Sequence, residues 1–296
     1  KMIKKLSVII VTFNSEDLIL SCLQSIFKFN DIGNSLEIII VDNSSNSNMM
    51  FANIRKLYSD DIKLISNSNN YGYGEGNNIG ISVSTAPNLL IMNPDARLIF
   101  PIFKSAISHF EKNKEVSIIG PKEVDENLKP ATSFYYRMEH QSLIRILFWQ
   151  KVFNKLDVFK QSKMYINGAC FFIRKDSFQK AGCFDSDIFL YAEEPDLITR
   201  IEKSNPTSIC EYDPKMKIVH LKKQSYNSLS TLKIAVDSAV YYLGKYNFDI
   251  AKYIKRRSTY SKLKFIQKIV TGKKDEAKVY QDISSYMKGI KILETK

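Results

Sequence analysis

The chain has 296 residues, a net charge of +12, 44% hydrophobic residues and 25% charged residues. This composition is that of a globular protein and argues against a disordered chain. No apolar run approaches the roughly 20 residues that a membrane-spanning helix needs, and the chain shows no signal-peptide pattern at its start. We therefore expect a cytoplasmic protein with either one large α/β domain and an appendage or two modest domains.

The positive charge is concentrated in the last quarter of the chain. Residues 222–296 contain 17 Lys and Arg against 6 Asp and Glu, which leaves residues 1–221 nearly neutral. Such asymmetry predicts an anionic partner surface, either a membrane or a nucleic acid. The cysteines have no C-x-x-C spacing, so reduced thiols are expected rather than disulfides or a zinc site. They are Cys22, Cys170, Cys183 and Cys210.

The first hundred residues alternate between strand-like and helix-like segments. Helices are predicted from the cap residues 14–17 to about Phe29 and again at about 48–58, and the glycine-rich segment 69–78 is interpreted as a loop that enters a third helix. Alternating strands and helices predict a parallel sheet with right-handed crossovers. The predicted strands are apolar, often β-branched runs at 6–13, 36–41, 62–65 and 88–92.

Beyond residue 100 the pattern is less regular. Segment 131–160 is aromatic and basic without a clear period, and we interpret it as a mobile loop over the site. From Leu229 onward, apolar residues recur at helical spacing. We therefore predict two regions, an α/β domain at 1–225 and a basic helical region at 226–296. The other predicted elements are helices at 103–112 and 177–181, and strands at 116–120, 165–174 and up to His220.

Polar residues follow three of the predicted strands. Pro94 cannot donate a ladder hydrogen bond, so the strand at 88–92 should end there and leave Asp95 at its carboxyl end. Open α/β sheets bind ligands at this edge, although each segment taken alone is more typical of an ordinary turn. The candidates are Thr12, Asn14, Asp42, Asn43, Asn93 and Asp95.

The glycine-rich segment is a second candidate. Gly72, Gly74 and Gly76 allow a ligand to approach the backbone, and a helix N-terminus beside them favours phosphate. The segment is not a dinucleotide fingerprint, because it does not follow the first strand, and it lacks the lysine of a P-loop. The alternative is a flexible loop with a glycine-capped turn.

An acidic segment framed by aromatic residues offers a general base. Glu193, Glu194 and Asp196 surround Pro195, which suits the first position of a helix. Apolar surroundings could raise the pKa of one carboxyl group toward the range of a general base. The alternative is a solvated acidic helix start. His220, at the end of an apolar strand, could be a structural histidine or a metal ligand.

Taken in order, these segments resemble family 2 of the inverting nucleotide-sugar glycosyltransferases, which have the GT-A fold. The similarity points to the rhamnosyltransferase-like branch that builds bacterial surface polysaccharides, and it covers roughly residues 5–225. Each motif is weak alone, but their order and spacing are specific. The matching motifs are Thr12-Phe13-Asn14, Val41-Asp42-Asn43-Ser44, Asn70-Tyr71-Gly72-Tyr73-Gly74-Glu75-Gly76-Asn77, Asn93-Pro94-Asp95, Gly182-Cys183-Phe184-Asp185, Glu193-Glu194-Pro195-Asp196-Leu197 with Arg200, and His220 with Ser225.

The resemblance implies a fold, an activity and site residues. The fold would be a mostly parallel central sheet flanked by helices, with a C-terminal helical extension. The activity would be transfer of a hexose or deoxyhexose from a UDP- or dTDP-linked donor to a saccharide or lipid-linked saccharide, in O-antigen or capsule synthesis. The implied nucleotide-sugar residues are Thr12, Asn14, Asp42, Asn43, Gly74, Gly76, Asn77 and Asn93. Asp95 and His220 would hold Mn²⁺ or Mg²⁺, and Gly168, Ala169 and Arg200 would border the acceptor.

Two positions depart from the family pattern. The family's base is the second acid of a Glu-Asp pair, and Glu194 stands there in this sequence, which leaves Glu193 and Asp196 as alternatives. The first acid of the family's Asp-x-Asp metal motif is replaced by Asn93.

The basic C-terminal helices suggest a partner as well. The dense patch at 252–257, with Tyr260, Phe265 and Ile266 nearby, predicts peripheral attachment to the cytoplasmic face of an anionic membrane. The alternative is the solvated face of a packing helix, and a homodimer is an open alternative to a monomer. Three other functions are alternatives. A nucleotidyltransferase would need a basic glycine loop after the first strand, and a nucleic-acid-binding protein would need basic and aromatic residues across the sheet. The third is an inactive relative that serves as a scaffold.

Overall fold

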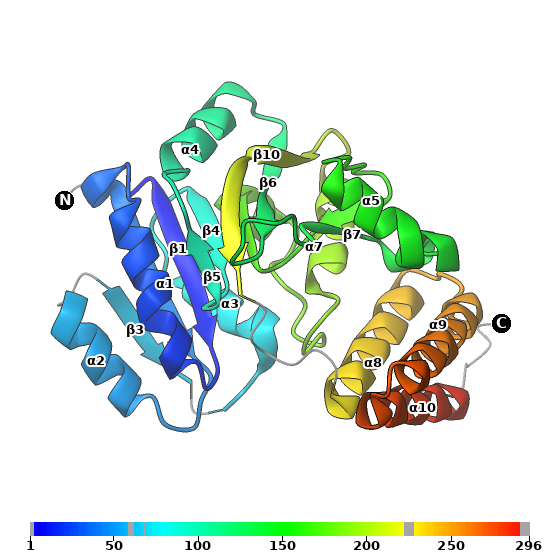
Figure 1. Cartoon of the computed structure of the whole chain (residues 1–296). Coiled ribbons are helices and arrows are strands. Elements are labelled where there is room, and N and C mark those ends of the chain that lie inside the picture. Colours follow the sequence, from blue (N-terminus) through cyan, green and yellow to red (C-terminus); the bar gives the residue numbers. More distant parts are fainter. Residues whose placement is uncertain (1–2, 59–61, 68, 222–227, 291–296) are drawn as a thin grey trace.

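A mixed eight-stranded sheet forms the centre of the protein, in the order β3-β2-β1-β4-β9-β6-β10-β5 (Figure 1). The computed structural model describes residues 3–58, 62–67, 69–221 and 228–290. β1 pairs in parallel with β2 and β4, and β9 runs antiparallel between β4 and β6. The mostly parallel α/β sheet predicted from the sequence is therefore confirmed. The strands are β1 (Leu6–Thr12), β2 (Leu36–Asp42), β3 (Ile62–Ser66), β4 (Asn88–Met92), β5 (Ala96–Leu98), β6 (Val116–Val124), β9 (Cys170–Arg174) and β10 (Ile209–His220).

Helices cover both faces of this sheet because its strands are apolar on both sides. In β1, Ile10 packs into the core on one face and Ile9 into the core on the other. The first face is covered by α1 (Glu16–Lys28), α2 (Asn48–Tyr58) and α4 (Phe103–Lys112). The second face is covered by α3 (Gly72–Ser82), α6 (Lys175–Lys180) and α7 (Glu193–Ser204).

Helix α3 lies unusually close to the sheet, and its glycines are the reason. A Cβ atom on Gly76 would lie 2.7 Å from Val11, and one on Gly80 would lie 2.6 Å from Ile9. The helix begins at Gly72, so the glycine-rich segment is mostly helical, which corrects the loop expected from the sequence. The glycines serve helix–sheet packing here.

The segment 131–166 contains regular structure, which corrects the irregular loop expected there. β7 (Phe134–Tyr136) pairs with β8 (Met164–Ile166), and η3 (Met138–His140), η4 (Arg145–Trp149) and α5 (Gln150–Lys155) lie between them. Buried Asn154 ties the segment together, because its side chain accepts from Ser133 N at 2.7 Å and donates to Phe134 O at 3.1 Å. The single strand expected at 165–174 is divided at 167–169, since β8 and β9 belong to different sheets.

Three helices follow the sheet, as predicted: α8 (Leu229–Lys245), α9 (Ile250–Val270) and α10 (Lys274–Gly289). They lie together on one side of the molecule (Figure 1). Tyr242 and Tyr253 pack against Met138, Ile188 and Ala192 of the preceding region. The predicted boundary at 225/226 falls outside the described residues. Among the helices that the structure describes, none is long and apolar enough to cross a membrane.

Candidate active site

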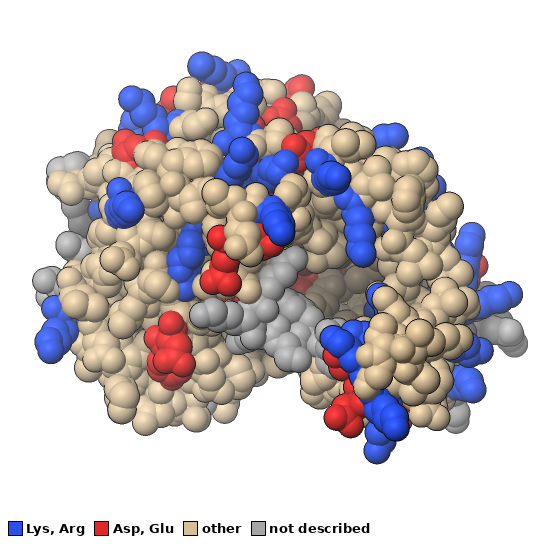
Figure 2. Space-filling model, viewed as in Figure 1, with Lys and Arg blue, Asp and Glu red and all other residues tan. Residues whose placement is uncertain are grey.

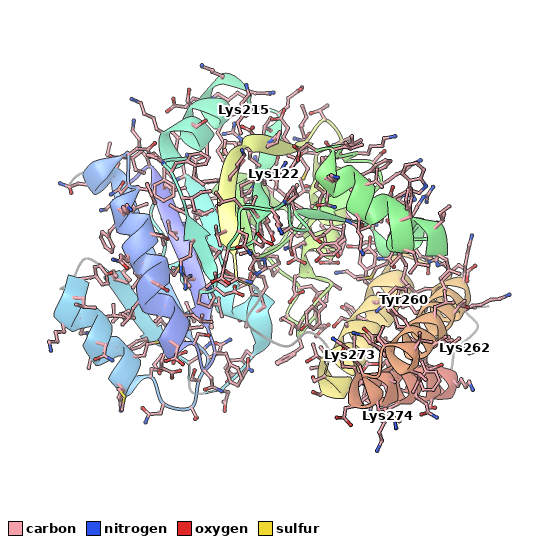
Figure 3. All side chains as sticks on the ribbon, in the orientation of Figure 1. Lys122, Lys215, Tyr260, Lys262, Lys273 and Lys274 are labelled. Atoms are coloured by element: carbon pink, nitrogen blue, oxygen red, sulfur yellow. The ribbon has the colours of Figure 1, made fainter. Side chains whose placement is uncertain are left out.

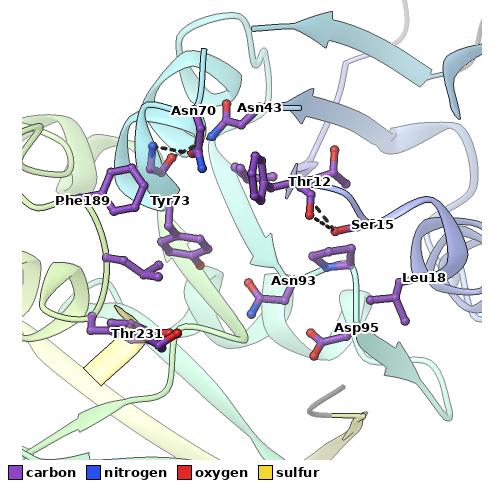
Figure 4. Close-up of a pocket in the computed structure, with 16 residues that line it drawn as sticks. Thr12, Ser15, Leu18, Asn43, Asn70, Tyr73, Asn93, Asp95, Phe189 and Thr231 are labelled. Carbon is purple, nitrogen blue, oxygen red and sulfur yellow. Dashed lines mark hydrogen bonds between the residues drawn. The ribbon is translucent and has the colours of Figure 1, made fainter. Parts of the chain in front are cut away.

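Two adjoining cavities open at the carboxyl ends of β1, β2 and β4. Both are lined by Tyr73, Asn93, Leu190, Tyr191 and Thr231, so they form one continuous site. In the first, Asn93 and Asp95 lie side by side, with Tyr73 and Thr231 across from them (Figure 4). The strand ends named from the sequence therefore meet, as expected for an open α/β sheet.

Asp42 holds a fixed carboxylate behind the first cavity. Its Oδ1 accepts hydrogen bonds from Thr12 Oγ1 and Ser44 Oγ, each at 2.8 Å. Ser44 Oγ also accepts from the backbone N–H of Asn14, which lies in the left-handed region with φ 48°. The other carboxylate oxygen, Oδ2, is buried and has no hydrogen-bond partner among the described residues. A buried acceptor without a partner suits an N–H or O–H group of a ligand.

Asn43 joins the end of β2 to the start of α3. Its Nδ2 donates to Gly72 O at 3.0 Å, and its Oδ1 accepts from Asn67 at 2.9 Å. Gly72 has φ +89°, and a Cβ atom there would lie 2.3 Å from Phe189 O, so only glycine fits this turn. The result is a rigid corner between β2, α3 and the 189–191 segment.

Three residues expected against the donor diphosphate lie elsewhere. Gly74 and Gly76 face protein atoms, because added Cβ atoms would lie 3.1 Å from Phe184 and 2.7 Å from Val11. Asn77 is buried and donates to Tyr73 O at 2.9 Å. None of the three is among the described residues that line either cavity. The α3 residues that do line a cavity are Gly72, in the first, and Tyr73, in both.

Asp95 and His220 meet at the edge between β4, β5 and β10. Asp95 Oδ2 lies 3.3 Å from His220 Nε2, and His220 Nδ1 lies 2.8 Å from Glu123 Oε2. Burial lowers the pKa of His220, but the two carboxylates outweigh it and raise the pKa to about 9. Asn167 Nδ2 donates to the other oxygen of Glu123 at 2.6 Å, which ties this corner to the segment before β9.

This corner fits a divalent cation. His220 Nε2 is buried and faces Asp95 Oδ2 without forming a hydrogen bond in the described part of the chain, and Glu123 orients the ring in the way that carboxylates orient metal-binding histidines. The described residues contain no group of three or more His, Cys, Asp or Glu that could hold a metal. Further ligands would therefore come from water and the donor diphosphate.

Glu194 lies in the first turn of α7 and lines the second cavity. It lies against Gly168, where a Cβ atom would clash with its Oε1. Burial raises the pKa of Glu194 to about 7. Burial and the charge of Glu194 raise the pKa of Glu193 well above its usual range, and Glu193 Oε2 accepts from Ala192 N at 2.8 Å. Of the two glutamates, Glu194 is the more accessible.

Asp196 and Arg200 face away from both cavities. Asp196 is fully buried and paired with Lys245 Nζ at 2.7 Å, Tyr246 OH at 2.8 Å and Arg200 Nε at 2.8 Å. Arg200 also donates to carbonyl groups of the turn around Gly182. These two residues join α7 to α8 and to that turn. Gly168 and Ala169 do line the second cavity, and Ser225 lies outside the described residues.

Several lining residues were not foreseen from the sequence. Tyr135 and Tyr165 are directly opposed on β7 and β8, with ring centroids 5.8 Å apart. Their alternation with Phe134 and Ile166 is a period-2 strand signal that would have placed them on one face. Glu123 and Arg257 gave no such signal, because each is an ordinary charged residue in its own segment.

The sheet order and the cavities at its carboxyl edge define an α/β protein of the GT-A type. The profile of glycosyl transferase family 2 matches residues 7–182. The chain belongs to this family.

A curated relative and two solved structures are similar to this chain. The low-salt glycan biosynthesis hexosyltransferase Agl10 of Haloferax volcanii is 26% identical over 209 residues, which are 69% of this chain and 64% of Agl10. The mannosyltransferase PcManGT from Pyrobaculum calidifontis, in complex with GDP-Man and Mn²⁺, has a TM-score of 0.60 and 15% identity, over 83% of this chain and 64% of that one. S. aureus TarS 1–349, in complex with UDP, has a TM-score of 0.52 and 13% identity, over 84% of this chain and 68% of that one. The two structures show the fold.

Proposed function

We propose that the protein transfers a hexose or deoxyhexose, with inversion, from a nucleoside-diphosphate sugar to a hydroxyl group of a saccharide or lipid-linked saccharide. The observation that carries this proposal is the Glu194 carboxyl group, which lines a cavity continuous with the one lined by Asn43 and Asp95. The relatives support the donor class, because Agl10 is a hexosyltransferase, PcManGT binds GDP-Man and TarS binds UDP. A role in surface-polysaccharide synthesis is part of the proposal.

The first cavity would bind the nucleotide. The unpartnered Asp42 Oδ2 suits the imide N–H of uracil or thymine, which is consistent with a UDP- or dTDP-linked donor. Asn43 and Asn93 offer amide groups along the same cavity. The nucleoside would therefore lie toward β1 and β2, with its diphosphate toward Asp95.

The second cavity would bind the acceptor next to the anomeric carbon. The acceptor hydroxyl attacks that carbon, the bond to the diphosphate oxygen breaks, and the hydroxyl proton passes to the Glu194 carboxylate. One in-line displacement inverts the anomeric configuration. Mn²⁺ or Mg²⁺, when held by Asp95 and His220, would supply positive charge that stabilises the leaving diphosphate. Tyr73 OH donates to Gly168 O at 2.7 Å and thereby fixes the backbone beside Glu194.

The proposal is tested by a thermal-shift panel of UDP, dTDP and GDP and their sugars, with and without Mn²⁺. We expect at least one nucleoside diphosphate to raise the melting temperature, and its sugar to be consumed when acceptors are added. No shift with any nucleotide would contradict the transferase function. A shift that is equal with and without Mn²⁺, and unchanged in Asp95→Ala, would contradict the metal assignment alone.

We also propose that α9 attaches the enzyme to an anionic membrane on the cytoplasmic face. Lys and Arg side chains are spread over the C-terminal helices, with uncharged and a few acidic side chains between them (Figure 2). The structure revises which part of α9 would do this, since Tyr253 is buried and Arg256 donates to Met138 O at 3.1 Å. The exposed apolar side chains lie further along the helix, at Leu263, Ile266, Ile269 and Val270. A basic helix with such a stripe is typical of membrane-surface binding.

Flotation with anionic vesicles tests the membrane proposal. We expect wild type to co-float with these vesicles and the double variant Ile266→Ser, Val270→Ser to remain behind. Met49→Ser is the matched control, because Met49 is an exposed apolar residue in α2. Equal flotation of the double variant and wild type would refute the proposal.

A further inference from the structure

The second cavity is closed on one side by the C-terminal helices. Thr231, Leu232 and Ala235 of α8 and Arg257 of α9 line it opposite the catalytic domain, which contributes Glu194. Its volume is about 450 Å³, which is within the usual range for a small-molecule site. The acceptor cavity is therefore shared between the sheet domain and the basic helical region.

Arg257 is held in place by aromatic neighbours. Its guanidinium lies over the Tyr260 ring, 5.4 Å from the centroid. Burial raises the pKa of the nearby Tyr253 phenol, and the charge of Arg257 opposes that rise. Tyr260 lies on the part of α9 nearest α8, whereas Lys262 points outward (Figure 3). A guanidinium fixed in this way loses little side-chain freedom when it binds a ligand.

Unlike Arg137 and Arg200, Arg257 lacks a carboxylate partner, and it is the only Lys or Arg among the described residues that line the two cavities. Arg137 pairs with Glu202 at 2.6 Å, and Arg200 pairs with Asp196 at 2.6 Å. Arg257 forms no ion pair with any carboxylate of the described residues. A positive charge without a counter-ion on a cavity wall favours an anionic ligand.

Further cations lie along α9 outside the cavity lining, where Asp249 is also close to Arg256. Arg256 lies near Arg145, and Lys264 lies near Lys151, so α9 and the 145–151 segment present cations to each other. Such a concentration of cations suits a group with up to two negative charges better than a single carboxylate. Arginine binds phosphate oxygens through two parallel N–H donors.

We infer that the acceptor carries a phosphate group and that Arg257 binds it, with the acceptor sugar between Arg257 and Glu194 beside Tyr135 and Tyr165. This inference rests on the proposed transferase function and specifies its acceptor class. The phosphate could belong to a lipid-linked sugar diphosphate or to a phosphodiester-linked polymer. Either source presents the same chemistry to the guanidinium.

The test is calorimetry on the full chain saturated with the nucleoside diphosphate that gives the largest thermal shift, so that the donor phosphate site is filled. Each of glucose, galactose, mannose and N-acetylglucosamine is compared with its 1-phosphate. We expect at least one 1-phosphate to bind about tenfold or more tightly than its parent sugar. Arg257→Gln should abolish this difference, Arg257→Lys should keep part of it, and the control Lys262→Gln on the same helix should leave it unchanged.

The outcomes separate the inference from the proposed function. If no nucleotide binds, the transferase function fails. If nucleotide binds but no 1-phosphate is preferred, or if Arg257→Gln keeps the preference while nucleotide affinity is normal, the phosphate inference is overturned. With the preferred sugar, tighter binding of its farnesyl diphosphate than of its glycerol phosphodiester would identify a lipid-linked source, and the reverse would identify a polymer.

Discussion

A Cβ atom on Gly168 would lie 1.6 Å from Oε1 of Glu194, so the carboxyl group occupies the space that any larger residue at 168 would need. Gly168→Ala should therefore displace the carboxylate from the acceptor cavity. Because a displacement of about 1 Å at a reacting group can cost about 10²-fold in rate, we expect kcat to fall by about that factor. Steady-state kinetics, with nucleotide affinity as the control for folding, would check this. Normal kcat in Gly168→Ala would mean that Glu194 does not act as the catalytic base.

Glu194 and Glu193 can be separated by isosteric substitutions. Glu194→Gln removes the proposed base, and we expect kcat to fall by about 10²- to 10⁴-fold with unchanged nucleotide affinity. Glu193→Gln should cost less, because Glu193 is buried and its Oε2 already accepts a hydrogen bond from the backbone of Ala192. The comparison is made by single-turnover kinetics. A larger loss in Glu193→Gln would transfer the role of base to Glu193.

The raised pKa of Glu194 gives a signed pH dependence of activity. Only the ionised carboxyl group can accept a proton, so kcat/KM should rise with pH through about 7 and level off above it. One pH unit below that value, activity should be about tenfold lower, since about a tenth of the groups are ionised. A profile that is flat from pH 5.5 to 8.5 would contradict this.

The same group makes stability depend on pH in the opposite direction. Its pKa in the folded protein lies above the ordinary value of about 4.5, so the bound proton stabilises the fold fully below about pH 4.5. This contribution is lost as pH rises through about 7. We therefore expect Glu194→Gln to be more resistant to urea than wild type at pH 8, and the difference to shrink at pH 5.

Asp42 should determine nucleotide affinity. Its Oδ2 is a buried acceptor without a partner in the described residues, and Asp42→Asn replaces one carboxylate oxygen by a donor. A hydrogen bond to a charged group contributes about 1.5–3 kcal/mol, so we expect roughly 10- to 100-fold weaker binding of the preferred nucleoside diphosphate. Calorimetry measures it, with Asp31→Asn as a surface control. Unchanged affinity would mean that the nucleobase does not bind at Asp42.

Metal binding should depend on the nucleotide. Asp95 and His220 would be two ligands; Glu123 contacts the other ring nitrogen of His220, and the described residues contain no group of three His, Cys, Asp or Glu that could hold a metal. We expect Mn²⁺ to bind the free protein weakly, to bind much more tightly with the nucleoside diphosphate present, and to lose this gain in Asp95→Ala. Tight Mn²⁺ binding to the free protein by calorimetry would contradict the two-ligand site.

The sheet was predictable because its signals are local. The apolar runs that form β1, β2 and β4 each end in polar residues, and a parallel sheet brings those ends together without further information. Helices α4 and α8 likewise follow from apolar spacing within single segments. Local patterns therefore located most elements and one edge of the site.

The acceptor side was not predictable in the same way, because it depends on contacts between distant segments. Glu123, for example, orients His220 across 97 residues of sequence. The glycines of α3 were misassigned for a related reason: Gly76 resembles a ligand-binding glycine in sequence, but its small size accommodates Val11. Which neighbouring residue fills the space left free by a glycine depends on tertiary packing.

The reversed strand β9 has a consequence for how this protein can vary. β6 ends at the edge of the sheet where the cavities lie, and β9, which runs antiparallel to β6, starts at the same edge. The connecting segment 125–169 therefore leaves the sheet and returns to it at this one edge. Insertions or deletions within it change the surface presented to the acceptor without altering the register of the sheet. The donor pocket, built largely on β1, β2 and β4, is spared. If the two cavities bind acceptor and donor as proposed, one antiparallel strand allows new acceptors to be adopted while the donor stays the same.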